Sequence, residues 1–318
     1  MKIHKSFGAA AALVFTISIS LLLLALPVSS QVVSDKSADR VTLLVTAVPS
    51  GDRERGIVEK LEPSDFAVLE NKKEQKILSV KKVTDSPMNV AVLIQDDLVS
   101  RVNLELPEIK QFITTLPQGS NVMVGYITGS NLQVREAFTT DLQKAADSLR
   151  ILFSSRSASG VSPYYAVRDA AKLFEPFRGG KNMMLLISDG LDVTSGLRFG
   201  SPYSSSSLDM AIDRAQSNGV AVFAFYAPSV GYTSISRLAV NYGQGSLLRL
   251  ANETGGSAFF AGMDFVTFDP YFKEIGEMNQ HQWLITYQSS TTGKDFRKIE
   301  VVTDFDINLL HPRGYDPK

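Results

Sequence analysis

Three seven-residue runs in the middle of the chain constrain the fold most, because they are almost wholly apolar on both faces. The runs are NVAVLIQ (89–95), NMMLLIS (182–188) and VAVFAFY (220–226). Successive side chains of a strand point to opposite faces, so a strand with no polar face must be covered on both sides. Segments with helical signals separate the runs. The pattern therefore predicts a doubly wound α/β domain with a mostly parallel sheet.

Helix start and stop signals support this reading. Ser162 followed by Pro163 is typical of a helix cap with proline at the first helical position. Thr140, with a glutamine three residues later, fits a capping box. Gly219 and Gly255 follow helix-like segments and are expected to end them.

The flanks of this domain have a different character. Residues 31–86 contain the strand-like runs RVTLLVTAV, FAVLEN and KILSVKKV, with SGDRERG read as a loop, and nothing there is obviously helical. Residues 282–318 contain two more strand-like runs, QWLITYQ and FRKIEVVT. We expect the α/β domain to span 87–281, and the two flanks to pack together as a small β-sandwich-like module.

Residues 1–30 resemble a secretory signal. Lys2 and Lys5 precede an apolar run that ends in a proline and small residues, so cleavage is expected before Gln31. The alternative is an uncleaved membrane anchor, which a run of ~20 residues allows. We expect an exported protein, periplasmic or secreted, that contacts a membrane only if this segment stays uncleaved.

Composition excludes several classes of function. The chain has no cysteine, so it can form no disulfide and carry no lipid on an N-terminal cysteine. Only His281 and His311 lie beyond the signal, which leaves little for histidine-based catalysis or zinc binding. No basic arm suggests nucleic acid, and no glycine-rich phosphate motif suggests a small-molecule cofactor.

Polar side chains gather where the predicted strands end. Asp96 and Asp97 follow the first run, with Ser100 close behind, and Asp189 follows the second. Ser162 introduces a helix beside them. Because carboxyl ends of parallel strands share one edge of a sheet, these oxygen ligands indicate a site for Mg²⁺ or Mn²⁺, with Ca²⁺ as a further option.

At these residues the chain resembles a von Willebrand factor A (VWA)-type domain, and more closely the bacterial secreted VWFA-related proteins. ISDG at Asp189 matches the turn after the fourth strand of such domains, and GVSPYYAV resembles their GGTALYDAL segment, with Ser162 at the threonine position. The resemblance implies a metal-ion-dependent adhesion site, whose open coordination position accepts an acidic side chain of a partner protein.

The first motif of that site, Asp-x-Ser-x-Ser, is altered. If Asp96 leads it, Leu98 replaces the first serine and Ser100 keeps the second. If Gln95 leads it, Asp97 takes the first serine position. We favour the Asp96 register, because it keeps a carboxylate and a hydroxyl. Either register loses one oxygen ligand, so the resemblance implies a degenerate site.

Two glycine- and serine-rich stretches, 192–207 and 226–246, follow strands next to this edge. Their aromatic residues, Phe199, Tyr203 and Tyr232, make them candidate partner-binding loops. The alternative is that the serine run is a flexible linker and that the second stretch is helical core.

The sequence thus predicts an exported, non-enzymatic protein-binding module. A hydrolase with a metal-activated water between the same carboxylates is the first alternative. A scaffold that binds no metal is the second.

Overall fold

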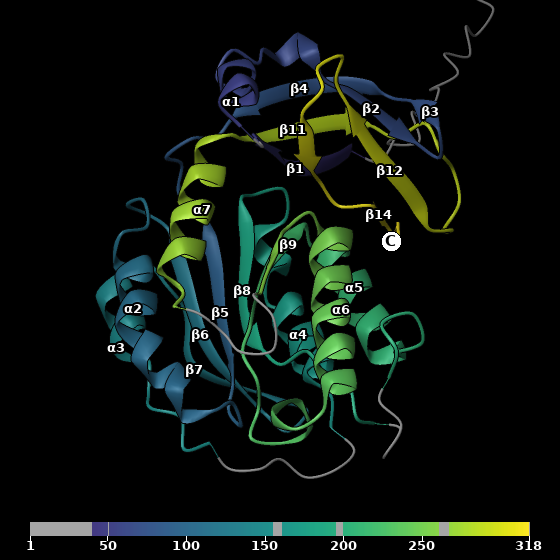
Figure 1. Ribbon diagram of the computed structural model, residues 1–318. Helices are drawn as coiled ribbons and strands as arrows, with labels where there is room; N and C mark the ends of the chain where they lie inside the picture. Colours follow the sequence, from purple (N-terminus) through teal and green to yellow (C-terminus); the bar gives the residue numbers. More distant parts are fainter. Residues whose placement is uncertain (1–39, 50, 155–160, 195–199, 261–266, 318) are drawn as a thin grey trace, which may run out of the picture. The chain divides into compact units, whose positions relative to one another are not determined.

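The computed structural model describes residues 40–49, 51–154, 161–194, 200–260 and 267–317 (Figure 1). The predicted signal segment, residues 1–30, lies outside them. Among the described residues, none of the helices combines the length and hydropathy needed to span a membrane.

The centre of the α/β domain is a six-stranded sheet with the order β10-β9-β8-β5-β6-β7. All neighbouring strands pair in parallel except β7, which is antiparallel to β6. Strand order reverses between β5 and β8, the third and fourth from the β7 edge. The strands are β5 (Asn89–Gln95), β6 (Asn121–Thr128), β7 (Asn131–Thr139), β8 (Asn182–Ser188), β9 (Val220–Tyr226) and β10 (Ala258–Phe259).

Helices cover both faces of this sheet (Figure 1). One face carries the 3-10 helix η2 (Ser100–Glu105), α2 (Leu106–Thr114), α3 (Leu142–Asp147) and α7 (Asp269–Gln280). The other carries α4 (Pro163–Lys172), α5 (Ser206–Ser217) and α6 (Arg237–Thr254). Short 3-10 turns, η3 (Glu175–Phe177) and η4 (Tyr232–Ser234), complete the connections.

The two-sided apolar character of the strands has the expected cause. In β5, Val90, Val92 and Ile94 pack into the core beneath α2 and α7, whereas Ala91 and Leu93 pack into the core beneath α4 and α5. All five side chains are inaccessible to solvent. The predicted doubly wound α/β fold is confirmed.

Local helix signals were partly right. Ser162 caps α4 by accepting a hydrogen bond from the Tyr164 N–H (3.3 Å). The prediction that Thr140 opens a helix was wrong by one residue, because Asp141 caps α3 by accepting from the Lys144 N–H (2.9 Å). A carboxylate is an equally good acceptor there.

The flanking strands form two antiparallel sheets, with orders β13-β1-β11-β4 and β14-β12-β2-β3. The N-terminal β1 pairs along seven residues with β11, and β2 pairs with β12, so strands from both flanks build each sheet. The strands are β1 (Arg40–Val48), β2 (Ala67–Glu70), β3 (Lys73–Glu74), β4 (Lys76–Lys82), β11 (Gln282–Gln288), β12 (Arg297–Val302), β13 (Asn308–Leu310) and β14 (Gly314–Tyr315).

The predicted loop SGDRERG is wrong, since most of it lies in helix α1 (Asp52–Val58). The first four residues of this helix are charged and it buries only Val58, so it carries no apolar stripe that a periodicity argument could detect. A 3-10 turn, η1 (Pro63–Asp65), follows it.

Candidate functional site

The ends of β5 and β8 lie side by side at the point where strand order reverses, which is where ligand sites of open α/β sheets are found. We call this side of the domain the carboxyl edge. It comprises residues 95–105, 149–154, 188–194 and 226–238 and the described part of the β8–α5 connection. The opposite side, where the parallel strands begin, is the amino edge.

Gln95, the last residue of β5, organises a buried polar network at the carboxyl edge. Its Nε2 donates to Asp97 Oδ1 (2.7 Å) and Asp189 Oδ1 (3.1 Å). Its Oε1 accepts from the Ser188 hydroxyl (2.5 Å) and the Asp189 N–H (3.2 Å). The side chain of Gln95 thereby joins two carboxylates that are 8% and 3% exposed.

Asp189 is the more buried of the two carboxylates in this network. Its Oδ2 accepts from the Thr233 hydroxyl (3.2 Å), and its Oδ1 from the Leu191 N–H (3.1 Å). Burial raises the pKa of Asp189 to about 6, and the charge of Asp97 adds to the rise. The hydrogen bonds oppose this shift but do not cancel it.

The backbone around Asp189 is fixed by two glycines. Gly190 has a φ of +65°, the left-handed conformation expected for the ISDG turn. Helix α6 passes so close that a Cβ at Gly243 would collide with the Asp189 carbonyl oxygen. The position of the Asp189 side chain is thus set by tight contact between the end of β8 and α6.

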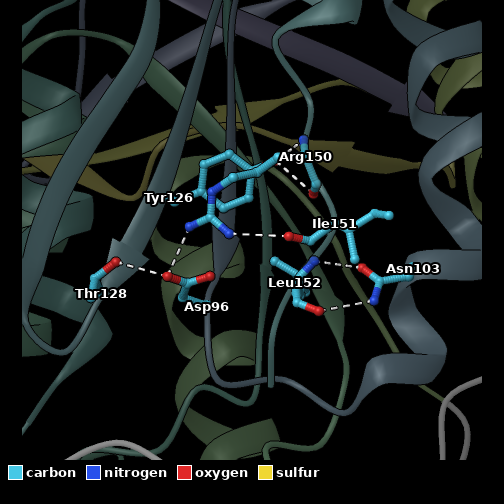
Figure 2. A network of polar contacts seen from close by, with 7 residues as sticks. All are labelled: Asp96, Asn103, Tyr126, Thr128, Arg150, Ile151 and Leu152. Atoms are coloured by element: carbon cyan, nitrogen blue, oxygen red, sulfur yellow. Dashed lines mark hydrogen bonds and ion pairs between the residues drawn. The ribbon is translucent and has the colours of Figure 1, made fainter. Parts of the chain in front are cut away.

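Asp96 belongs to a different set of polar contacts, with Thr128 and Arg150 (Figure 2). Its Oδ2 accepts from the Thr128 hydroxyl (3.1 Å) and from Arg150 Nη2 (2.8 Å), with both members of the ion pair about one quarter exposed. The guanidinium of Arg150 lies over the Tyr126 ring, 4.1 Å from its centroid. Asp96 therefore holds the connection after α3 rather than facing Asp189.

A second pair of bonds fastens the same connection (Figure 2). Asn103, in η2, donates to the Leu152 carbonyl (3.1 Å) and accepts from its N–H (2.7 Å). Tyr126 OH accepts from the Arg150 N–H (2.7 Å). Nothing in the sequence pattern pointed to Arg150 or Asn103, because neither lies in a recognisable motif.

The two predicted serine ligands also lie apart from the Gln95 network. Ser100 is exposed at the start of η2. Ser162 is buried and bonds to the Ser207 hydroxyl (2.8 Å). Ser207 in turn donates to Asp192 (2.7 Å). These bonds form a second buried network, centred on Asp192, to which the sequence assigned no role.

Asp192 is 2% exposed. Burial disfavours its charge, but hydrogen bonds from Ser205, Thr194 and Ser207 outweigh that cost and lower its pKa. The serine run 204–207 supplies two of these donors, so it is built into the fold and the linker alternative does not hold for it. An aspartate near a serine run is the only signal that could have suggested this.

The aromatic residues of the candidate partner-binding loops differ in their exposure to solvent. Phe199 lies outside the described residues. Tyr203 is 87% exposed. Tyr232 is partly buried and packs against Leu191 and Val193. The predicted loop 226–246 is shorter than expected, since α6 begins at Arg237.

The predicted five-ligand set is not brought together. Asp97 and Asp189 are linked by hydrogen bonds from the Gln95 side-chain amide. Gln95 leads the alternative register of the first motif, in which Asp97 takes the first serine position. Asp96 has an arginine as its partner, and Leu98 is buried in the core. No group of three or more acidic, histidine or cysteine side chains in the described ranges could hold a metal ion. The donor set therefore fits a divalent cation poorly.

The chain thus contains a doubly wound α/β domain. The Gln95 network lies where the strand order of its sheet reverses, between β5 and β8. No family model matches the chain, and no curated protein matches it. Similar solved structures include BatB from Bacteroides thetaiotaomicron, with 16% identity and a TM-score of 0.43, covering 60% of this chain and 98% of that one.

Two further similar structures carry the words VWA or manganese in their descriptions. One is the manganese-loaded TRAP protein of Plasmodium vivax, with 10% identity, a TM-score of 0.41 and coverage of 79% and 100%. The other is the SpRpn10 VWA domain, with 13% identity, a TM-score of 0.34 and coverage of 54% and 86%. Sequence identities and TM-scores this low indicate neither a shared activity nor a shared ligand.

Proposed function

We propose that this chain is a VWA-like protein-binding module, and that its partner docks on the carboxyl edge of the six-stranded sheet. The support is the uneven distribution of exposed apolar side chains. Among the described residues, the six most exposed large apolar side chains all belong to this edge. They are Leu104, Ile151, Phe153, Tyr203, Ile235 and Leu238, and we call them the apolar rim.

These six side chains are more exposed than the other large apolar side chains of the described residues. Phe153 is 85% exposed, Tyr203 87% and Ile235 78%, whereas the most exposed large apolar side chain elsewhere in the described ranges is Phe296, at 46%. Single exposed apolar residues are ordinary, but several on one side of a domain are typical of a surface that a partner covers. Aromatic residues in particular contribute strongly to binding energy.

The buried networks beneath the rim support the same proposal. Asn103 and Arg150 fasten the segment that carries Ile151 and Phe153 to η2 and to Asp96. Asp189 bonds to Thr233, in the connection that carries Ile235. The rim is therefore held in place before a partner arrives, which lowers the entropy cost of binding.

The test is site-specific cross-linking in the cell that makes the protein. A photoreactive amino acid at position 153 or 203 should join the chain to a partner, and the same group at Leu78, an exposed apolar residue of β4, should not. With that partner purified, Phe153→Ser and Tyr203→Ser should each weaken binding about tenfold or more, since central aromatic contacts contribute over ~1.4 kcal/mol. Equal affinity of the variants and wild type would refute the proposal.

The divalent cation stays a prediction. Differential scanning fluorimetry with Mg²⁺, Mn²⁺ or Ca²⁺ against a chelator tests it on wild type and Asp189→Ala. A cation that binds the native state raises the melting temperature of wild type only. Because the Gln95 amide occupies the space between the two carboxylates, we propose that the rim binds its partner without a metal, and the melting temperature should not change.

Export likewise stays a proposal, supported by the signal-like residues 1–30. Mass spectrometry of the mature chain should find Gln31 at its N-terminus. Recovery of the uncleaved chain in the membrane fraction would favour the anchor alternative.

A further inference from the structure

A cavity of about 330 Å³ lies at the amino edge of the sheet, between α2 and α7 and beside the start of β8. Its walls include the apolar side chains of Met88, Phe112 and Phe272. Phe112 and Phe272 stack on each other with ring centroids 4.9 Å apart. Most of the other lining residues are polar or charged. The volume lies in the range of small-molecule sites, and the lining offers both aromatic surface and polar groups.

One wall presents a buried amine. Lys181 is 4% exposed, and its Nζ donates to the Val83 carbonyl at 3.3 Å. Burial lowers the pKa of Lys181 to about 8, although Asp85 partly opposes the shift. An ammonium group has three hydrogens to donate, and leaving donors unused inside a protein is costly.

The facing helices present acceptors. Glu108, in α2, and Asn279, in α7, each have a buried side-chain oxygen without a hydrogen-bond partner among the described residues. No ion pair among the described residues includes Lys181 or Glu108. The cavity therefore has an unpaired positive group on one wall and an unpaired negative group on another.

The other charged groups of the cavity already have partners. Lys273 pairs with Asp269 at 2.6 Å. Asp85 accepts from Gln280 (3.2 Å). The Asp85 charge also acts on Lys181, but the two form no ion pair. Lys181 and Glu108 are the charged groups of the cavity that have no side-chain partner in a hydrogen bond or ion pair among the described residues, and a ligand that pairs with both must itself carry both signs of charge.

We propose that this cavity binds a small zwitterion, namely an α-amino acid with an apolar side chain. Its carboxylate would meet Lys181, and its ammonium group would meet Glu108 and Asn279. Its side chain would lie against Phe112 and Phe272. The site is separate from the apolar rim, so the proposal does not depend on the proposed function.

The binding test uses three amino acids and two matched analogues. L-Leucine, L-methionine and L-phenylalanine at millimolar concentration should raise the melting temperature, and calorimetry should give a saturable isotherm. 3-Phenylpropionate, which lacks the ammonium group, and 2-phenylethylamine, which lacks the carboxylate, should bind about tenfold more weakly than phenylalanine, because each loses a charge-assisted hydrogen bond.

Variants locate the site. Lys181→Met and Glu108→Gln should each weaken amino-acid binding about tenfold or more. Lys273→Met is the matched control, since it removes a lysine of the same cavity that already has a partner, and it should bind like wild type. The proposal fails if none of the three amino acids binds, if the analogues bind as tightly as phenylalanine, or if the two site variants bind like the control. Glu108→Gln keeps the test decisive should Lys181→Met not fold.

Discussion

The two edges of the central sheet use polar side chains in opposite ways. At the amino edge, Asn89 opens β5 between Asn121 of β6 and Asn182 of β8, in register with both. The three amides form a ladder, with Asn121 donating to Asn89 and Asn89 donating to Asn182, each at 2.9 Å. At the carboxyl edge, one amide, Gln95, instead holds two buried carboxylates.

The two kinds of polar group differ in their electrostatic cost. The asparagine ladder is neutral, and its two amide–amide bonds join three strands in register without burying a charge. Asp97 and Asp189 are buried close enough for one charge to raise the pKa of the other. A fold does not need such a pair, and unfavourable buried charges at a switch point are typical of functional sites.

The largest effect is expected from Gln95→Ala. The change removes the donor shared by Asp97 and Asp189 and leaves two charges facing each other in a buried position. Hydrogen bonds to charged groups contribute about 1.5–3 kcal/mol each, so we expect a loss of roughly 3–5 kcal/mol in the free energy of unfolding. Urea denaturation at pH 7 measures it.

A second substitution separates charge repulsion from lost packing. On the Gln95→Ala background, Asp97→Asn should recover part of the lost stability, because it removes one charge. If the double variant is no more stable than Gln95→Ala, the two carboxylates do not interact as described.

At the amino edge, Asn182→Ala should cost about 2–4 kcal/mol. Asn182 is fully buried, accepts from Asn89 and donates to the Phe177 and Asn218 carbonyls, so its removal leaves buried groups without partners. Because no charge is involved, the loss should not change between pH 5 and 8. A pH-dependent loss would contradict the neutral character of the ladder.

A smaller and pH-dependent effect is expected at Asp189. Its folded-state pKa, about 6, lies above the unfolded value of ~3.9. Between these values the native state holds a proton that the unfolded state has released, so stability falls as pH rises from about 4 to 6, by roughly 2–3 kcal/mol. Asp189→Asn should flatten this part of the curve, which urea denaturation at several pH values tests.

The sequence predicted the sheet better than the site. The bounds of β5, β8 and β9 follow from their apolar runs, since a strand covered on both faces lacks the polar side that a surface strand has. That the residues after β5 and those after β8 lie at one edge of the sheet required only the parallel order of the strands. Both of these inferences rest on the backbone.

Side-chain direction could not be predicted in the same way. Adjacent residues after a strand diverge, and which of Asp96 and Asp97 faces Asp189 depends on Arg150, a residue 54 positions from Asp96. The Asp96 register keeps both a carboxylate and a hydroxyl, but the Asp96 carboxylate forms an ion pair with Arg150. Tertiary partners of this kind leave no periodic signal.

The smallest effect on stability is expected at the apolar rim. Phe153 is 85% exposed, so Phe153→Ser should change the free energy of unfolding by less than about 0.5 kcal/mol while it weakens partner binding. Leu152→Ser, one residue earlier, should unfold more easily by roughly 2–4 kcal/mol, because Leu152 is 2% exposed and packs in the core. If Phe153→Ser were as destabilising as Leu152→Ser, the Phe153 side chain would contribute to the folded core. Its exposure would then no longer support the apolar rim as a binding surface.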